Sequence, residues 1–306
     1  MNTLFRNVHC PNRQTLLIAA ALVVHLFAEP HPALASDVLV VKDSNIKPYQ
    51  EAIQGFKQSC GCSVRELDLS DLGALEQAVK SRPDAIVSVG AQAFRKVKLI
   101  KNVPLIYLMV MPTETSGVLG ENVSGVSMDI APAAYLTAMT ALFPGAKKIG
   151  VLFDPEHTGR FVREAATAAQ EKGLSLIIKP VRDPREAPAL LDELRDKIDL
   201  LWMLPDATLV NSGTIDHLLL FSFQHSIPVF TFSKKFAEMG ALAALTIDPD
   251  VMGRQAGEMT QSLLRGAKGP LRAYARNPHL IVNTKVGAKL GVRINDELLQ
   301  NAGTVE

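Results

Sequence analysis

The chain is organised around a strand–helix–strand pattern that occurs twice. At residues 198–232 an apolar strand pattern ends at Pro205-Asp206, and a helical pattern and a second apolar strand follow. Residues 85–110 have the same order, with a turn at Gly90 between the first strand and the helix. The strands show little polar alternation, which indicates burial on both faces and favours parallel sheets covered by helices.

The same repeat extends upstream of both segments. From residue 38 to a strand that begins at Ser63, and from residue 148 to a strand that begins at Leu174, the order is strand, polar loop, helix, glycine stop and strand. We therefore predict an α/β fold with two similar Rossmann-like lobes, each built on a parallel sheet. Polar loops then lie at the carboxyl ends of the strands, where open α/β sheets bind ligands. Two such sheets that face each other predict a cleft between the lobes.

The first 35 residues have the pattern of a secretory signal peptide. Two arginines precede an uncharged apolar run at residues 16–27, and Ala33-Leu34-Ala35 matches an A-x-A cleavage pattern. A retained membrane anchor is the alternative, but the run is shorter than the roughly 20 residues that a spanning helix needs. We therefore predict cleavage before Ser36 and export to a bacterial periplasm, with secretion as the alternative.

Length and charge bound the remainder of the chain. The 306-residue chain less the 35-residue leader leaves 271 residues, which is long for a single core and suits two lobes. The leader contains two basic residues and one acidic residue, so the remainder has 30 basic and 30 acidic side chains and no net charge. No stretch concentrates basic residues together with aromatic residues, so nucleic-acid binding is not expected.

The order of elements predicts where the chain passes between the lobes. We expect crossings near Asp129, Ile247 and Pro278. The resulting division assigns residues 36–128 and 248–277 to lobe 1, and residues 129–247 and 278–306 to lobe 2.

Four further segments complete this prediction. Residues 125–128 read as a short edge strand, residues 241–246 as the last strand of the second sheet, and residues 284–300 as a helical tail. A helix that begins at Pro249 is expected to return to lobe 1. Its Gly253 predicts close packing against a neighbouring helix.

Cys60 and Cys62 flank Gly61 at a predicted helix end. An oxidising compartment would allow them to form a small-ring disulfide. The alternative is two small apolar residues that flank the helix stop and stay reduced. A metal site is not expected here, because no further ligand residues lie nearby in the sequence.

Candidate ligand contacts in the first lobe follow two predicted strands. Ser44 and Asn45 lie in the loop after the first strand. Gly90, Ala91 and Gln92 begin a helix, and free backbone N–H groups at a helix start bind carboxylate or phosphate well. An ordinary tight turn is the alternative interpretation of a lone glycine. We predict that these N–H groups hold an anionic group of the ligand.

Candidate contacts in the second lobe also follow strands. Asp154 and His157 lie in the loop after residues 148–153, Asp206 and Thr208 follow a buried strand, and Ser233 follows the next strand. A metal or catalytic site is not expected, because the polar residues of the first loop are not at ligand spacing on one face. We expect Asp154 and Asp206 to hold a cationic or hydroxyl group. A cap or turn role is the alternative for Asp206.

Four stretches resemble those of a known family. They are DSNIKPYQEAIQGFKQ at residues 43–58, VSVGAQA at 87–93, IPVFTFSKKFAEMGALAAL at 227–245 and GRQAGEMTQSLLRG at 253–266. They are similar to stretches in the ABC-transporter substrate-binding proteins of the tryptophan/tyrosine-type family. The resemblance covers nearly all of residues 37–293 and implies the type I periplasmic-binding fold.

Three positions depart from the pattern of that family. Many members have a hydroxyl residue where this chain has Ala91, and an amide- and serine-rich loop where this chain has Asp154-Pro155-Glu156-His157. Asp206-Ala207 stands where the family pattern usually reads Asp-Asn. Two donors to a ligand carboxylate are therefore missing, and acidic groups are added.

The resemblance implies a periplasmic solute-binding component of an ABC uptake transporter. The expected ligand is an amino acid or a related small organic solute bound between the lobes, and the expected partner is an inner-membrane ABC permease. A ligand-sensing protein that acts on a signalling partner is the alternative. The sequence contains no G-x-S-x-G, H-E-x-x-H or P-loop motif, so we expect no enzyme activity. We also expect a monomer without cofactor or metal.

Overall fold

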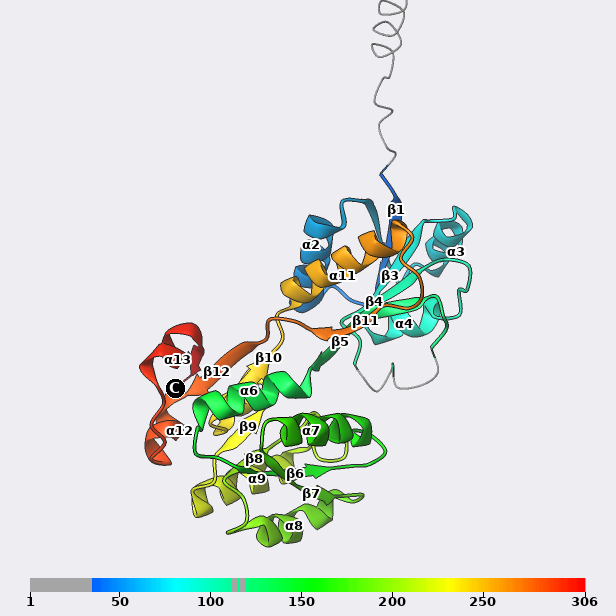
Figure 1. Ribbon diagram of the computed structural model, residues 1–306. Coiled ribbons are helices and arrows are strands. Elements are labelled where there is room, and N and C mark those ends of the chain that lie inside the picture. The colour runs from blue at the N-terminus through cyan, green and yellow to red at the C-terminus, as the bar shows by residue number, and fades with distance from the viewer. Residues whose placement is uncertain (1–34, 112–114, 116–118, 306) are drawn as a thin grey trace, which may run out of the picture. The chain divides into compact units, whose positions relative to one another are not determined.

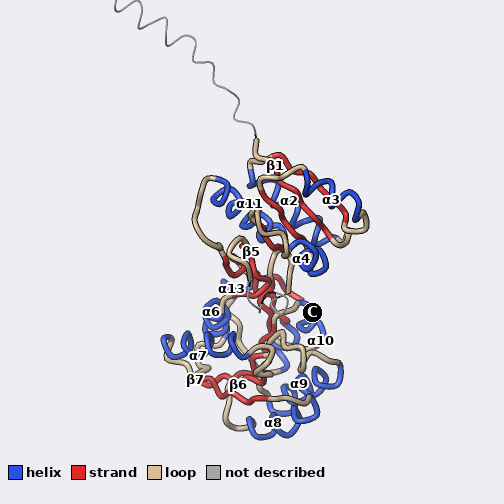
Figure 2. Tube along the Cα trace, turned by 90° about the vertical axis from the view of Figure 1, so that its right-hand side faces the viewer, coloured by secondary structure: helices blue, strands red, loops and turns tan. Residues whose placement is uncertain are grey.

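The computed structural model describes residues 35–111, 115 and 119–305. The predicted signal peptide, apart from Ala35, lies outside the described residues, so its cleavage stays a prediction. From Ser36 onward the chain forms one unit that contains two sheets. Each sheet is covered by helices, which the ribbon and the tube show from two directions (Figure 1, Figure 2).

The first sheet has six strands in the order β11-β5-β4-β3-β1-β2, and its described pairs are parallel. Its strands are β1 (Asp37–Lys42), β2 (Ser63–Asp68), β3 (Ala85–Val89), β4 (Leu105–Leu108), β5 (Val123–Ile130) and β11 (Arg272–Ala275). Its helices are α2 (Lys47–Cys60), α3 (Leu72–Lys80), α4 (Ala91–Val97) and α11 (Pro249–Leu264).

Strand β1 shows why this sheet is buried on both faces. Successive side chains point to opposite faces of a strand. Val38 and Val40 therefore join the core under α2 and α11, while Leu39 and Val41 join the core on the other face. The prediction of a parallel sheet buried on both faces is confirmed.

Helices α2 and α11 pack closely because glycines face the contact. A Cβ on Gly253 of α11 would lie 1.9 Å from the carbonyl oxygen of Ala52, and a Cβ on Gly55 of α2 would lie 2.1 Å from the carbonyl oxygen of Asp250. No side chain fits at these separations. The predicted close packing of α11 is confirmed, and α11 lies beside α2 in the first lobe (Figure 1).

The second sheet has seven strands in the order β13-β12-β10-β9-β8-β6-β7. Its strands are β6 (Lys148–Phe153), β7 (Ser175–Pro180), β8 (Leu200–Trp202), β9 (Val229–Thr231), β10 (Ala243–Thr246), β12 (His279–Asn283) and β13 (Gly303–Val305). Its helices are α6 (Pro132–Leu142), α7 (Gly159–Glu171), the 3₁₀ helix η1 (Pro184–Glu186), α8 (Ala187–Leu194), α9 (Ser212–His225), α10 (Lys234–Met239), α12 (Thr284–Lys289) and α13 (Asp296–Asn301). Strand β12 pairs antiparallel with β10, and the other described pairs are parallel.

The structure corrects the predicted ends of both sheets. Strand β5 is not a short edge strand at residues 125–128, because it runs from Val123 to Ile130 and β11 pairs with it on its outer side. The second sheet continues past residues 241–246 into β12 and β13, so the tail is not purely helical. Both errors come from the missed strands β11, β12 and β13, which are short and partly exposed and lack the long apolar runs of central strands.

Cys60 and Cys62 are joined by a disulfide at the end of α2, with their Cα atoms 5.2 Å apart. The intervening Gly61 has a φ of 60°, a left-handed conformation that favours glycine. Of the two alternatives that the sequence left open, the structure contains the disulfide.

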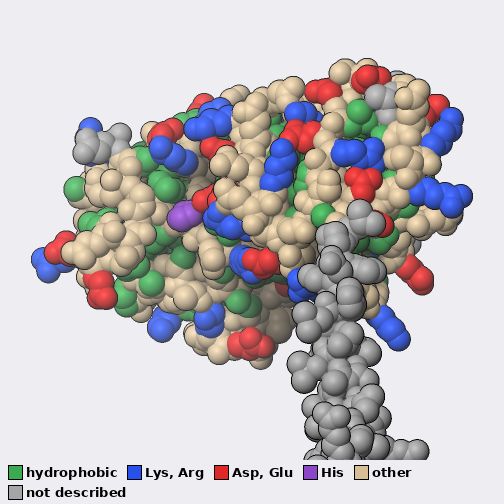
Figure 3. Space-filling view, turned by 90° about the horizontal axis from the view of Figure 1, so that it is seen from above, with side chains coloured by type: hydrophobic (Ala, Val, Ile, Leu, Met, Phe, Trp, Pro, Cys, Tyr) green, Lys and Arg blue, Asp and Glu red, His purple; other side chains and the backbone are tan. Residues whose placement is uncertain are grey.

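Charged side chains are mixed on the molecular face in Figure 3. Lys and Arg side chains lie among Asp and Glu side chains there, without one large patch of a single sign. This mixture agrees with the zero net charge that we counted for residues 36–306, and it gives that face no electrostatic preference for a polyanion.

Candidate ligand-binding site

A cavity of about 260 Å³ lies at the carboxyl ends of strands from both sheets. Its wall is formed by residues that follow β4, β8, β9 and β10, by the end of β5, and by the first turns of α6 and α7. Open α/β sheets bind ligands at this edge. The described lining residues are Met111, Met128, Asp129, Ile130, Tyr135, Phe161, Pro205, Phe232, Ser233 and Ile247.

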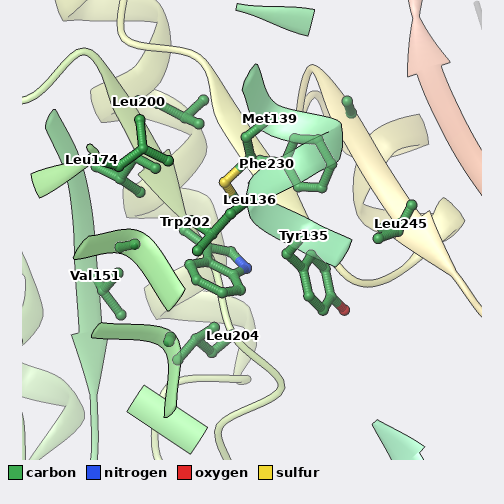
Figure 4. Close-up of a cluster of buried hydrophobic side chains, with 14 of the residues drawn as sticks. Tyr135, Leu136, Met139, Val151, Leu174, Leu200, Trp202, Leu204, Phe230 and Leu245 are labelled. Atoms are coloured by element: carbon green, nitrogen blue, oxygen red, sulfur yellow. The ribbon is translucent and has the colours of Figure 1, made fainter. Parts of the chain in front are cut away.

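Aromatic rings form one side of this cavity. The ring centroid of Tyr135 lies 5.1 Å from that of Trp202 (Figure 4), and the centroid of Phe161 lies 5.6 Å from that of Trp202. These pairs are tilted or edge-to-face, as aromatic pairs in protein cores prefer. Trp202 is 1% exposed, and its Nε1 has no hydrogen-bond partner among the described residues. The single tryptophan of the chain thus packs behind two rings that a bound solute would touch.

Asp129 is the one acidic side chain among the described residues that line this cavity. It lies near the end of β5, and its backbone N–H donates to the hydroxyl of Ser127 at 3.1 Å. Burial raises the pKa of the Asp129 carboxyl to about 6, although the positive charge of Arg160 and a hydrogen bond from Ser127 oppose the shift. The negative charge of Glu164 adds a further, smaller increase. This carboxyl group therefore changes its charge close to neutral pH.

A second cavity of about 280 Å³ adjoins the first, because neighbouring residues of β5 and α7 line both. Its described lining residues are mostly polar: Tyr107, Thr115, Ser127, Arg160, Glu164, Arg272, Ala273 and Tyr274. The Tyr274 hydroxyl donates to the Glu164 carboxylate, and Arg160 Nε lies 3.7 Å from Glu164 Oε1. Burial and Glu164 raise the pKa of Tyr274, so its hydroxyl keeps the proton that it donates.

The predicted contacts Asp154, Asp206 and Thr208 are bonded to one another. Asp206 is fully buried, and its Oδ2 accepts hydrogen bonds from the Asp154 N–H at 2.7 Å and the Thr158 hydroxyl at 2.5 Å. Its Oδ1 accepts from the Thr208 N–H at 3.0 Å. The Thr208 hydroxyl donates to Asp154 Oδ2 at 2.6 Å, and the Glu156 N–H donates to Asp154 Oδ1 at 2.9 Å. These bonds tie the loop after β6 to the loop after β8.

This network changes our interpretation of the two carboxylates. All four oxygens accept hydrogen bonds from the protein, and the bond from Thr208 lowers the pKa of the Asp154 carboxyl. These bonds hold the two loops in place. For Asp206 this corresponds to the cap or turn role that the sequence left open as the alternative to ligand binding. Nearby, His157 Nε2 lies 3.9 Å from Asp154 Oδ2. Direct ligand contacts by Asp154, Asp206 and His157 stay predictions.

Asp43 occupies the helix start that we expected to hold a ligand anion. Its Oδ2 accepts from the Gln92 N–H at 2.9 Å. Gly90 has a φ of 96°, and a Cβ there would lie 2.4–2.5 Å from the Asp43 carboxylate. A carboxylate of the protein is therefore already present beside Gly90, Ala91 and Gln92, and a ligand anion would have to displace it.

The neighbouring residues in the same loop are also engaged locally. Asn45 donates its side-chain amide to Asp68 Oδ2 at 3.3 Å, and its backbone carbonyl accepts from the Gln50 side chain at 3.0 Å. Ser44 is half-buried in this loop. Contacts of Ser44 and Asn45 with a ligand stay predictions, since neither residue is among the described lining residues of the two cavities.

Sequence reasoning missed most of the cavity wall. Of the predicted contacts, Ser233 lines it, whereas Asp129 and Ile247 had been assigned only to crossings between lobes. Tyr135 and Phe161 were not among the predicted contacts. A usable signal was present: Asp129 and Ile247 lie at predicted crossings between the lobes, and residues beside a crossing are candidates for the wall of a cavity between the sheets.

Among the described residues, no group of three or more His, Cys, Asp or Glu side chains is placed to hold a metal ion. No helix in that same part of the chain has the length and apolar character needed to cross a membrane. The described cavity wall offers apolar contact, aromatic rings and one carboxylate.

Two mostly parallel α/β sheets with a ligand-sized cavity at their carboxyl edges define the class of two-lobed solute-binding proteins with the type I periplasmic-binding fold. Comparison with known families gives the particular group. The model of the family described as ABC transporter substrate binding protein matches residues 62–306. The chain belongs to this family.

Individual relatives share only limited sequence identity with this chain. A tyrosine-binding protein of Clostridioides difficile (strain R20291) is 25% identical over 197 residues, which cover 61% of this chain and 56% of the relative. The chain therefore spans little more than half the length of this curated relative.

Solved structures share the fold. A ligand-free, open substrate-binding protein with adhesive properties from Clostridium difficile has a TM-score of 0.67 and 20% identity, and the match covers 89% of this chain and 99% of that one. An ABC domain in complex with L-Trp from Streptococcus pneumonia has a TM-score of 0.55 and 20% identity, with 89% and 100% covered. At this identity the likeness establishes the fold alone.

Proposed function

We propose that this chain is the solute-binding component of an ABC uptake transporter. It binds a small organic solute in the cavity of about 260 Å³ and presents it to an inner-membrane permease. The observation that carries the proposal is the position of the cavity, whose wall combines strand ends from both sheets. Family membership supports it and favours transport over the signalling alternative.

The wall of the cavity favours a solute with a ring or another apolar body. Tyr135, Phe161 and Phe232 offer aromatic surface, and Met111 and Met128 offer flexible apolar surface. The relatives point the same way, since one is named for tyrosine and one solved structure contains L-Trp. Aromatic amino acids and related ring-bearing solutes therefore form the first set of candidate ligands.

The proposed location and state follow from the transport role. The mature chain starts at Ser36, resides in the periplasm, acts as a monomer and releases its solute chemically unchanged. Intact mass measurement of periplasmic material tests the start. Recovery of unaltered solute after prolonged incubation with the protein tests the absence of turnover, and a converted product would contradict it.

Trp202 provides an internal reporter for the binding test. It is the single tryptophan, it is buried, and it packs against two cavity-lining rings. A solute that enters the cavity should change its emission in a saturable way and raise the melting temperature. At a hundred times its dissociation constant, a ligand should stabilise the fold by about 2.7 kcal/mol.

A matched pair of variants locates the binding event. The Trp202 test is applied as a screen of candidate solutes. Phe161→Leu removes a cavity ring and should weaken the binding of any solute that this screen identifies. Leu220→Ala alters a side chain on α9 that is 53% exposed and outside the described cavity wall, so it should leave affinity unchanged. Equal affinities in the two variants would place binding elsewhere, and a screen without any saturable response would contradict the proposed function.

A further inference from the structure

The charge of the cavity wall points to the kind of solute that it binds. Asp129 is the one charged side chain among the described lining residues, and the others are apolar, aromatic or hydroxyl-bearing. No cationic group of the described chain lies within 4 Å of its carboxylate, and Arg160 instead lies 3.7 Å from Glu164 Oε1. An ionised carboxylate in such surroundings is costly unless a cation pairs with it.

The start of α4 in the first lobe is not free to bind a ligand carboxylate. At α4 the Gln92 N–H already donates to Asp43, and the missing Cβ of Gly90 leaves the space in which the Asp43 carboxylate lies. A ligand carboxylate at this place would meet a second carboxylate at short range. This arrangement disfavours a ligand with its own anionic group on that side.

Asp129 of β5 is therefore the acid available to a ligand among the described lining residues of the cavity. The oxygens of Asp154 and Asp206 are bonded to the protein, whereas Ser127 supplies the side-chain hydrogen bond to Asp129 in the described part of the chain. A ligand ammonium group against Asp129 would replace the missing cation. The rings of Tyr135 and Phe161 beside it would stabilise the same positive charge through their faces.

We propose that the solute is an organic monocation, an amine carried on an apolar or aromatic body without a carboxylate. Its ammonium group pairs with Asp129, and its body lies among Tyr135, Phe161 and Phe232. This inference rests on the proposed function and narrows the ligand class of the same cavity. It separates the chain from relatives named for zwitterionic amino acids.

The adjoining polar cavity defines the competing outcome. A zwitterionic solute could place its carboxylate near Arg160 or Arg272. Both guanidinium groups already have partners, because Arg160 lies beside Glu164 and Arg272 Nε donates to the carbonyl oxygen of Val123 at 3.3 Å. An amine without a carboxylate needs neither group.

The test compares solutes that differ only in the carboxylate. Calorimetric titration of the full mature chain with phenethylamine and L-phenylalanine, and with tryptamine and L-tryptophan, measures the effect of that one group. We expect each amine to bind at least tenfold more tightly than its amino acid. Tighter binding of either amino acid than of its matched amine would overturn the inference.

Three variants separate pairing with Asp129 from the general field of the cleft. Asp129→Asn keeps the shape, removes the charge and should weaken amine binding at least tenfold. Glu164→Gln removes a negative charge from the adjoining cavity and should change amine affinity less than threefold. Arg160→Gln should leave amine affinity unchanged or raise it. Equal amine affinity in Asp129→Asn and the parent protein would overturn the inference.

The same screen distinguishes this inference from the proposed function. If no amine binds but a neutral or anionic solute gives a saturable Trp202 response, the ligand class is wrong and the solute-binding function stands. If no solute of any class binds to the folded protein, both fail. Thermal unfolding of each variant confirms that a lost affinity reflects the site rather than the fold.

Discussion

Two groups of carboxylates lie near the carboxyl edges of the sheets, and they differ in what surrounds them. Asp206 is fully buried, yet both of its oxygens accept hydrogen bonds from the loops it joins. Asp129 is less buried but faces an apolar, aromatic cavity with little support. The difference shows that position at a strand end does not make an acid a ligand contact. A carboxylate whose oxygens already accept hydrogen bonds from the protein stabilises the fold, whereas one without such bonds is available to pair with a ligand.

The largest expected effect is on stability, from Asp206→Ala. The substitution leaves the N–H groups of Asp154 and Thr208 and the hydroxyl of Thr158 without their acceptor. Each unsatisfied buried donor costs about 1–3 kcal/mol, and part of this cost is relieved by water. We expect the free energy of unfolding to fall by about 3 kcal/mol, measured by denaturant titration.

A control variant sharpens this prediction. Thr208→Val removes one hydroxyl bond to Asp154 and keeps the Asp206 acceptors, so it should cost only about 1 kcal/mol. Solute affinity of the folded Asp206→Ala fraction should change less than its stability. A variant with unchanged unfolding and lost binding would instead support the sequence-based assignment of Asp206 to the ligand.

The next largest expected effect is an increase in the free energy of unfolding rather than a decrease. Asp129→Asn should raise the stability of the ligand-free protein at pH 7.5 by roughly 1–3 kcal/mol, because it removes a poorly solvated charge. The folded pKa of about 6 lies above the value of 3.8 for a free side chain, so the folded state binds the proton more tightly. Stability of the parent protein should therefore fall as pH rises from about 4 to about 6.

Matched pH profiles of the two proteins check that sign. The difference between their free energies of unfolding should be small at pH 4, grow up to about pH 6 and stay constant above it. A destabilised Asp129→Asn protein at pH 7.5 would mean that Asp129 is satisfied by the fold, as Asp206 is, and would remove the contrast between them.

The contrast also explains which features the sequence could predict. Periodicity and turn residues predict the parallel core of both sheets, because central strands such as β1 are apolar between their end residues. The polar loops after the strands were also located correctly. The hydrogen-bond partners of those loops were not, because Asp206 meets Thr158 across 48 residues and Asp43 meets Gln92 across 49. Pairings at such separations depend on packing that no local pattern encodes.

The third prediction concerns affinity and pH. Pairing with an ammonium group needs ionised Asp129, so apparent affinity for phenethylamine should fall about tenfold between pH 7.5 and pH 5. The groups around Asp129 are Arg160 and Glu164 of α7 and the tyrosines Tyr107, Tyr135 and Tyr274. The pKa values of these tyrosines are raised, so they stay protonated across this range. Calorimetry at both pH values tests the change, and a flat profile would contradict pairing with this carboxyl.

The smallest expected effect comes from Asp43→Ala, which tests whether Asp43 at the start of α4 excludes a ligand carboxylate. Asp43→Ala frees the Gln92 N–H at the start of α4 and removes a carboxylate from the cleft side of the sheet. The loss of this cap-like contact should cost about 0.5–1 kcal/mol of stability, as other helix-start substitutions do. Affinity for L-phenylalanine should rise about two- to threefold, because its carboxylate could use the vacated donor, while affinity for phenethylamine should not rise.

The matched variant Asp43→Asn keeps an acceptor for the Gln92 N–H but removes the charge. If charge repulsion alone excludes a ligand anion, this variant should show the same gain for L-phenylalanine without the loss of stability. If occupancy of the N–H group excludes it, only Asp43→Ala should show the gain. Unchanged L-phenylalanine affinity in both variants would mean that the start of α4 takes no part in selecting the solute, and selection would then rest on Asp129.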